Sequence, residues 1–292
     1  MSSQNLTKKI VITGRSGYLG SLISCELERK GFAVTGIARA KLSRTDQLAD
    51  EIRSAWAVIN LAGAPILQRW SPKNKQLIYE SRVVTTKNLV QTINDLPVEQ
   101  RPKKFISASA IGIYKAGKLH TESSKNHDTG FVGKVVHDWE APIPNLPPDV
   151  QQTIFRIGPV IGKQSQLITQ LLLPFKLGLG ATIGPGKQAF PFVHANDLVS
   201  AFAWAIENNP GNETFNLVAP EKISNKTFTQ KLAKKLHRPA FLFIPEFALK
   251  LIYGEAADIL ITAPEVSAEK ILAAGFCFKY PTIDLALDEI FR

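Results

Sequence analysis

Three glycines near the amino terminus are spaced as in a loop that holds the phosphates of a dinucleotide. The segment Lys9-Ile-Val-Ile-Thr-Gly14-Arg-Ser-Gly17-Tyr-Leu-Gly20 places them between an apolar strand and a helix. Gly14 permits a tight turn, Gly17 lets the backbone approach a diphosphate, and Gly20 allows close helix–strand packing. Backbone N–H groups at the helix start then hold phosphate. We therefore predict dinucleotide contacts throughout the loop: Gly14, Arg15, Ser16, Gly17, Tyr18, Leu19 and Gly20.

The end of the second expected strand indicates which dinucleotide is bound. An NAD site places an acidic residue there to hold the ribose 2′-hydroxyl. This chain instead has Ala38-Arg39-Ala40-Lys41, without a carboxylate. A guanidinium pairs well with a 2′-phosphate, and Arg15 in the loop adds a second cation. We therefore predict NADP(H) as the cofactor, with Ala38 and Arg39 at its 2′-phosphate.

Two later strands also end in residues suited to a ligand site. Asn60-Leu61-Ala62-Gly63 supplies small residues whose backbone can line a cofactor cleft. Ser107-Ala-Ser109 ends another strand, with Tyr114 shortly after it. A serine that orients a substrate oxygen, together with a tyrosine acid, suits hydride transfer to or from an alcohol. Ser109 and Tyr114 are therefore candidate catalytic residues.

These residues need a scaffold of alternating strands and helices, which the apolar pattern supplies. Short, uniformly apolar strands separated by helical stretches predict an α/β fold with a doubly wound parallel Rossmann sheet. We expect this domain over residues 1–160 plus about 191–218. A smaller C-terminal substrate lobe would comprise 161–190 and 219–292. Glycines and a proline between 178 and 186 predict loops through the 170s and 180s, and residues 263–273 are expected to form a helix.

Composition and charge exclude several classes of protein. The chain has 292 residues, 45% of them apolar, with ordinary glycine and proline content, so disordered and collagen-like classes are excluded. No apolar run reaches 18 residues and no signal peptide is recognisable, so no membrane partner is expected. Two distant cysteines, Cys25 and Cys277, suit a reducing compartment and predict a cytoplasmic protein. The histidines lack metal-ligand spacing, so no metal is expected.

The net charge of +10 attracts polyanions without specifying one. The largest basic cluster, which runs from Lys231 to Arg238, has the spacing of a solvated helix face, and no nucleic-acid-binding motif accompanies it. We therefore predict a small-molecule substrate and no nucleic-acid partner. The sequence leaves the oligomeric state undecided, and a homo-oligomer is one alternative.

Motifs along nearly the whole chain resemble one family. It is the extended short-chain dehydrogenases, and specifically the atypical epimerase-like group labelled "sugar nucleotide epimerase" or "cell-division inhibitor". The matching pieces include the glycine loop, Asn60–Gly63, Arg69-Trp70, Ser81-Arg82, Ser107-Ala-Ser109, Trp139-Glu140, Arg156-Ile-Gly158, Leu173–Gly180, Gly184–Gln188, Phe192–Asp197, Phe215–Leu217, Arg238-Pro239, Gly254-Glu255 and Ala274–Phe276.

The resemblance implies an NADP-binding Rossmann domain and a C-terminal lobe that shapes a substrate cleft. It places Arg39 at the 2′-phosphate, Leu61 and Ala62 near the adenosine, and Arg82 beside the cofactor. The other cofactor residues so predicted are Gly63, Ser107, Gly158 and Val160, the last two near the nicotinamide. Candidate substrate residues are Arg69, Trp70 and His194, although His194 is equally suited to a structural role.

The catalytic residues depart from the pattern of the wider superfamily, which uses a serine with Tyr-x-x-x-Lys on one helix. The corresponding helix here, Phe131–Glu140, holds no tyrosine. A literal Tyr114-x-x-x-Lys118 occurs among glycines, where a long helix is not expected. The catalytic groups therefore stay open. Tyr114 could act from a loop, Lys134 could reach the cofactor, or an unassigned group could supply the proton.

Two functions follow from this reading. The first is an NADP(H)-dependent oxidoreductase or epimerase acting on a polar, sugar-nucleotide-like substrate. The alternative is an NADP(H)-sensing regulator that has lost catalysis and is linked to cell division, as the family label suggests. The missing helix tyrosine motivates the alternative.

Overall fold

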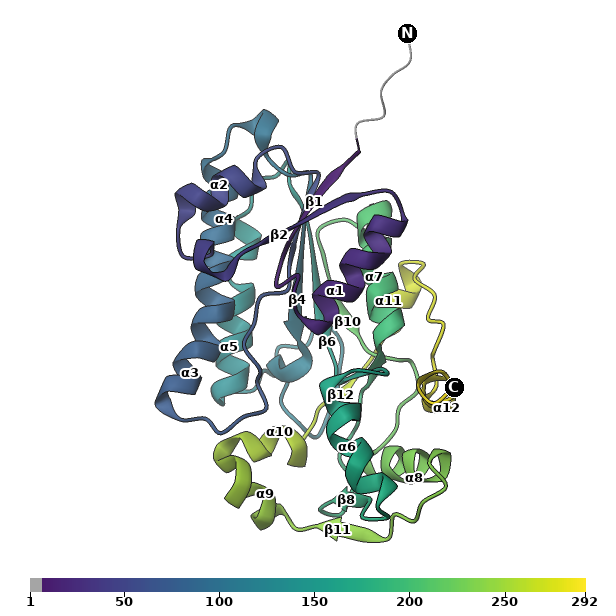
Figure 1. Ribbon diagram of the computed structural model, residues 1–292. Helices are drawn as coiled ribbons and strands as arrows, with labels where there is room; N and C mark the ends of the chain where they lie inside the picture. The colour runs from purple at the N-terminus through teal and green to yellow at the C-terminus, as the bar shows by residue number, and fades with distance from the viewer. Residues whose placement is uncertain (1–6) are drawn as a thin grey trace.

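A six-stranded parallel sheet forms the centre of the computed structural model, which describes residues 7–292 (Figure 1). Its strands are β1 (Lys9–Thr13), β2 (Ala33–Ile37), β3 (Ala57–Asn60), β4 (Lys104–Ala110), β6 (Gln151–Ile157) and β10 (Glu213–Leu217). Their spatial order is β10-β6-β4-β3-β1-β2. Every neighbouring pair is parallel, so all six strands end at one edge of the sheet.

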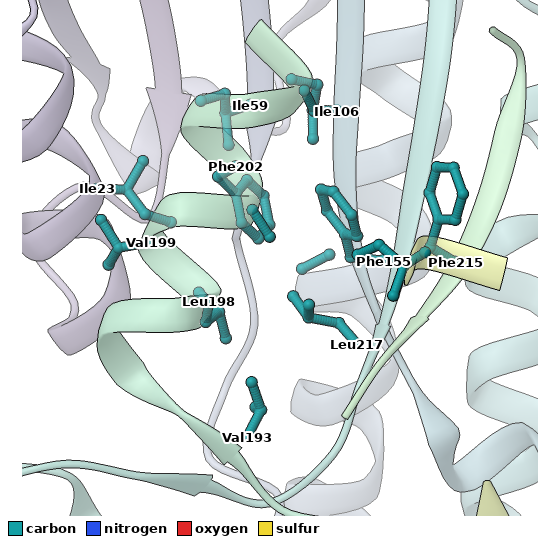
Figure 2. Close-up of a cluster of buried hydrophobic side chains, with 14 of the residues drawn as sticks. Ile23, Ile59, Ile106, Phe155, Val193, Leu198, Val199, Phe202, Phe215 and Leu217 are labelled. Atoms are coloured by element: carbon teal, nitrogen blue, oxygen red, sulfur yellow. The ribbon is translucent and has the colours of Figure 1, made fainter. Parts of the chain in front are cut away.

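The sheet is buried on both faces because its strands are apolar at successive positions. In β1, Ile10 and Ile12 contribute to one hydrophobic cluster, and Val11 between them contributes to a second. Figure 2 shows the first cluster, where Phe202 and Leu198 pack toward Phe155 of the sheet. This alternation requires helices on both sides, as in a doubly wound fold.

Helices cover the two faces in separate groups (Figure 1). α1 (Tyr18–Arg29) and α7 (Ala195–Glu207) pack together on one face. The other face carries α2 (Thr45–Ile52), α4 (Thr85–Asp95) and α5 (Phe131–Glu140), with α3 (Pro72–Tyr79) leading into α4. The predicted α/β Rossmann fold is confirmed.

A third hydrophobic cluster lies in the C-terminal part of the chain. Its members include Ile168, Phe175, Phe228 and Leu232. The elements of this part are α6 (Gln166–Lys176), β8 (Ala181–Ile183), α8 (Asn225–Lys235), β11 (Leu242–Ile244), α9 (Glu246–Tyr253), α10 (Asp258–Ile261), α11 (Glu269–Ala273) and α12 (Ile283–Ile290). Two short parallel pairs join them to the remainder: β5 (Leu119–His120) with β12 (Glu265–Val266), and β7 (Val160–Ile161) with β9 (Val193–His194).

Two local predictions differ from the structure. Residues 170–176, which were expected in a loop, belong to α6, because Ser165 caps the helix start and Ile168 and Phe175, seven residues apart, are buried. The helix expected over 263–273 is confined to α11, because β12 pairs with β5 instead. Residues 266–276 also contribute to the cluster on the sheet, so they pack with the first predicted domain.

Candidate functional site

The strand order reverses at β1, which has β2 on one side and β3 on the other. Ligands of open parallel sheets bind beyond the carboxyl ends of the strands at such a reversal. We call the region at the carboxyl ends of β1, β2 and β3 the switch point.

Buried polar side chains fix the backbone at the switch point. The Thr13 hydroxyl donates to Oδ1 of Asn60 at 2.8 Å. It also accepts the N–H groups of Leu61 at 3.0 Å and Ala62 at 3.1 Å. Asn60 Nδ2 donates to the fully buried Ser107 hydroxyl at 3.3 Å. Leu61 and Ala62 are therefore held at the predicted adenosine side, and the geometry gives Ser107 a supporting role.

The glycine loop has the geometry that its spacing predicts. Gly14 has a φ of +72°, and the Gly17 N–H donates to its carbonyl at 3.0 Å. A Cβ at Gly20 would overlap that same carbonyl and lie 2.8 Å from the Arg15 Cα, so only glycine fits there. α1 begins at Tyr18 without a side-chain cap, which leaves its first N–H groups available. The loop therefore fits a bound diphosphate.

Two arginines lie near the carboxyl end of β2 and differ in their partners. The Arg15 stem crosses Gly36 of β2, where a Cβ would come within 2.9 Å of it. Its guanidinium pairs with Glu28 at 2.8 Å. Arg39 directly follows Ala38 at the strand end and is exposed, and it makes no side-chain hydrogen bond or ion pair within residues 7–292. Arg39 therefore presents the uncommitted guanidinium of the two.

Arg82 is a second cation without an acidic partner in the described part of the chain. Its guanidinium donates to the carbonyls of Ala64 at 2.9 Å and Ile78 at 3.3 Å, and lies over the Trp139 ring. A Cβ at Gly63 would come within 3.0 Å of it. Burial lowers the pKa of Arg82 to about 10. A half-buried guanidinium that hydrogen-bonds only to carbonyls favours an incoming anion.

Ser109 lies in a buried ionic network at the end of β4. It is 4% exposed, and its hydroxyl donates to Oε1 of Glu140 at the end of α5. Arg156 of β6 binds the same carboxylate through two nitrogens, at 2.9 and 2.6 Å. Burial opposes the charge on Arg156, but its hydrogen bonds to Glu140 raise the pKa of Arg156 above its ordinary value.

Tyr114 belongs to the same network. It is 2% exposed, and its hydroxyl accepts from Arg156 at 2.8 Å and donates to Oδ1 of Asn216 at 2.8 Å. Burial raises the pKa of Tyr114 above its ordinary value, although Arg156 partly offsets the rise. The phenol is therefore protonated at neutral pH, with its proton committed to Asn216.

The third catalytic candidate, Lys134, lies apart from this network. Its side chain is 69% exposed and pairs with Asp138 at 3.0 Å. The inward face of α5 instead carries Val132 and Val136, and a Cβ at Gly112 would lie 2.6 Å from Val132. The structure thus brings Ser109 and Tyr114 together without Lys134.

The predicted substrate residues on the loop after β3 have different surroundings. Trp70 donates from Nε1 to the Ile66 carbonyl at 3.0 Å and packs edge-on against Phe131 at 4.9 Å between ring centroids. Arg69 is exposed, and its carbonyl accepts from Asn74. Trp70 is therefore fixed, whereas the Arg69 side chain makes no hydrogen bond within residues 7–292.

His194 is buried and fully hydrogen-bonded. Its Nδ1 accepts the N–H of Asn196 at 3.2 Å, which caps α7. Its Nε2 therefore carries the proton and donates to Glu289 at 3.0 Å. Burial lowers the pKa of His194, so the neutral ring is favoured. These contacts suit the structural alternative for this residue.

Gly158 and Val160 follow β6 at the same edge of the sheet. A Cβ at Gly158 would overlap the Pro191 carbonyl, so the chain can pass there only with glycine. Val160 begins β7 and is half-buried. Their predicted position beside the nicotinamide stays a prediction.

Comparison with known proteins identifies the family. The model of the NAD-dependent epimerase/dehydratase family matches residues 10–217. This chain belongs to that family. A domain of unknown function (DUF1731) matches residues 244–290. The predicted family, which was the epimerase-like group of extended short-chain dehydrogenases, is confirmed.

Relatives of this dehydrogenase-family chain cover nearly its full length. The human epimerase family protein SDR39U1 is 31% identical over 97% of this chain and 99% of its own length. The Arabidopsis thaliana homologue, described as chloroplastic, is 31% identical over 100% of this chain and 89% of its own. A crystal structure of human SDR39U1 with NADPH has a TM-score of 0.90 and 30% identity, over 97% of this chain and 99% of that one.

Some residues with clear structural roles were not assigned by the sequence analysis. Glu140, Arg156 and Asn216 bind Ser109 and Tyr114, and Thr13 and Asn60 fix the switch point. A charged residue within an apolar strand, such as Arg156 in β6, is the signal that could have indicated a buried partner.

Residues 7–292 contain neither a membrane-spanning helix nor a metal-binding cluster. No described helix is both long enough and apolar enough to cross a bilayer. No group of histidine, cysteine and acidic side chains in the same residues is arranged to hold a metal ion.

Proposed function

We propose that this chain binds NADP(H) at the switch point. The glycine loop and the uncapped start of α1 suit the diphosphate, and Arg39 suits the 2′-phosphate. No carboxylate occurs among Ala38, Arg39, Ala40 and Lys41 to favour NAD. The NADPH in the crystal structure of human SDR39U1 supports the same choice.

We infer further that this chain acts as an NADP(H)-responsive regulator. In such a protein, binding of the nucleotide changes the affinity for a partner, and no reaction is catalysed. The observation that carries this inference is the network of Ser109, Glu140, Arg156, Tyr114 and Asn216. Bound NADPH supplies a hydride donor, but reduction of a carbonyl also needs a proton at its oxygen. In this network the hydroxyl protons of Ser109 and Tyr114 are already donated to protein acceptors.

The second candidate is an oxidoreductase or epimerase that acts on a polar, sugar-nucleotide-like substrate. Membership of the epimerase/dehydratase family favours it. Arg82 also favours it, because a guanidinium with only carbonyl partners can hold an anionic substrate as well as a nucleotide. Arg69 and Trp70 would then contact that substrate.

Activity and binding measurements distinguish the two candidates. Purified protein with NADPH is mixed with a panel of carbonyl compounds and sugar nucleotides, and nucleotide oxidation is followed by absorbance. The regulator predicts no turnover and a protein partner whose affinity in a pull-down changes with NADP(H). Turnover that Ser109→Ala abolishes would establish the enzyme and refute the regulator.

The cofactor assignment has its own test. Arg39→Asp should weaken NADPH binding by about 1.5–3 kcal/mol, since it removes a charged hydrogen-bonding contact. NADH binding should change far less. Arg53→Asp is the matched control, because Arg53 precedes β3 and lies toward the opposite edge of the sheet. Equal losses for both nucleotides in calorimetry would refute the 2′-phosphate assignment.

The cellular location stays a prediction. Cys25 and Cys277 are free and exposed, which suits the expected reducing cytoplasm.

A further inference from the structure

A polar groove lies beside β10, the strand at the end of the sheet farthest from β2. Its volume is about 580 Å³, within the range of about 300–1,000 Å³ that is usual for ligand sites. Three elements contribute to it: the segment that follows β5, the first half of β10, and the start of α11. We call it the edge groove, and its lining comprises residues 121–123, Arg156, residues 212–214, Ser267, Glu269 and Lys270.

The backbone of β10 is open on the side that faces this groove. β10 pairs with β6 and with no other strand of the six-stranded sheet. The Asn216 N–H points away from β6, since it donates to Oε1 of Glu122 at 2.7 Å. Backbone groups of alternate residues point to the same side of a strand, so the N–H and C=O of Thr214 also face outward. The hydrogen bonds within residues 7–292 give neither group a partner on that side.

The two ends of β10 differ in how this edge is covered. At the carboxyl end, Glu122 binds the backbone of Asn216, and the Ser267 carbonyl accepts from the Asn216 side chain at 3.3 Å. Thr214, two residues earlier, instead lines the groove. Sheet edges that do not pair are commonly protected by lysine or proline, and Glu213–Leu217 contains neither. An extended peptide can therefore add to β10 at Thr214.

The charges that line the groove indicate which peptide fits. The Arg156 guanidinium is already paired within the buried network described above. Lys270 pairs with Glu213 at 2.6 Å. The carboxylates of Glu122 and Glu269 remain, and neither forms an ion pair in the described part of the chain. The free charge of the groove is thus negative, although the whole chain carries +10, and it favours a basic partner.

We propose that the edge groove binds an extended basic segment of a partner protein, which adds a strand to β10 at Thr214 and places a lysine or arginine beside Glu122 and Glu269. Backbone hydrogen bonds would provide affinity, and the side chains at alternate positions would provide specificity. The switch point lies toward the opposite edge of the sheet, so both sites can be occupied together. Such a partner suits a regulator, but the proposal stands without one, because the groove does not involve NADP(H).

Peptide binding to the full chain tests the proposal. An array of hexapeptides is used, with lysine at every second position and varied residues between. An extended hexapeptide spans about 20 Å, slightly more than β10. The member that binds the wild type most tightly is labelled with fluorescein and titrated by anisotropy at an ionic strength of about 0.15 M. The same peptide with glutamate in place of each lysine should bind at least about tenfold more weakly, since it would meet like charges.

Two variants of the protein locate the site. Glu122→Gln with Glu269→Gln removes both free charges, and the new amide oxygen still accepts the Asn216 N–H. This variant should bind the lysine peptide about tenfold more weakly. Asp46→Asn with Glu99→Gln is the matched control, because both residues are exposed acids outside the groove, and its affinity should not change. Circular dichroism and NADPH titration check that each variant is folded.

The second variant, Thr214→Pro, removes the open N–H. An edge strand tolerates proline where the N–H faces away from its neighbour, and the lysine peptide should again bind about tenfold more weakly. The peptide itself provides the same test if this variant does not fold. Two forms of it are N-methylated at the odd or at the even positions, and at least one should lose about tenfold in affinity, because its N–H groups face β10.

Other results would overturn the proposal. A wild type that binds no member of the array would refute it, and so would equal affinities of the charge variant and its control. If both N-methylated forms bind as tightly as the unmodified peptide, the peptide does not pair with β10. If spermidine displaces the lysine peptide at equal concentration, the groove is a site for small cations and not for a protein segment.

Discussion

The two halves of the sheet's carboxyl edge differ in how their polar groups are satisfied. At the ends of β1, β2 and β3, the start of α1 has no side-chain cap, and neither Arg39 nor Arg82 has a carboxylate partner among residues 7–292. At the ends of β4, β6 and β10, the Ser109 and Tyr114 hydroxyls both have protein partners.

This difference separates ligand binding from proton chemistry. A ligand-binding group keeps hydrogen-bond donors without protein partners, so we call the first half open. A structural group has all its donors and acceptors paired within the protein, so we call the second half saturated. The open half therefore has the properties of a binding site. The saturated half has those of a structural core, although it contains the residues that looked most catalytic in the sequence. The three predictions below test whether the two halves are independent.

The largest effect is expected in the saturated half. Arg156→Ala leaves the Glu140 carboxylate buried without its cation, so the free energy of unfolding should fall by about 3–5 kcal/mol. Urea unfolding followed by circular dichroism measures the loss. If the halves are independent, the folded variant binds NADPH with nearly unchanged affinity.

Arg29→Ala is the matched control for this prediction. Arg29 also binds a carboxylate through two nitrogens, that of Glu26, but its side chain is 71% exposed. An exposed pair contributes little to stability, because water screens the two charges. A similar loss in both variants would mean that the Arg156 network is no more important than a surface pair.

The next effect is expected in the open half. Gly20→Ala forces a Cβ into the Gly14 carbonyl and so distorts the loop. NADPH affinity should fall at least tenfold, which is about 1.4 kcal/mol or more. Gly130→Ala is the control, since its Cβ would meet only the flexible Asp128 side chain before α5. Unchanged NADPH binding in Gly20→Ala would show that the loop does not hold the nucleotide.

The sequence predicted the open half better than the saturated one, for a physical reason. Gly14, Gly17 and Gly20 act through local backbone geometry, which their spacing encodes directly. The partners of Tyr114 are Arg156 and Asn216, which are 42 and 102 residues away along the chain. Such pairings arise only when β4, β6 and β10 are assembled, so spacing alone could not indicate them.

The same reasoning explains the errors in secondary structure. The glycines between 178 and 186 correctly indicated turns, but they follow α6 and do not interrupt it. Residues 263–268 have an apolar pattern that suits a helix, and tertiary pairing of β12 with β5 overrides it. Local sequence preference therefore decides the structure of tight turns. It is overridden where a strand distant in the sequence pairs with the segment.

Arg82 provides the smallest and most discriminating test of the comparison. Its folded-state pKa of about 10 is below the ordinary 12.5, so the unfolded chain binds this proton more tightly. Below pH 10 the folded state therefore carries the whole desolvation penalty, of about 3 kcal/mol. Arg82→Met removes that penalty but also two hydrogen bonds, each of about 0.5–1.5 kcal/mol. The ligand-free variant should therefore have a free energy of unfolding between the wild-type value and about 2 kcal/mol above it.

NADPH affinity should fall about tenfold in the same variant, because the anion loses its half-buried cation. Arg101→Met is the matched control, since Arg101 donates to two carbonyls as Arg82 does but also pairs with Asp149 at 3.1 Å. Arg101→Met should lower stability and leave NADPH affinity unchanged. Thermal unfolding with and without NADPH measures both quantities. If Arg82→Met is strongly destabilised and binds NADPH normally, Arg82 stabilises the fold and does not bind the nucleotide. The open half would then not differ from the saturated half.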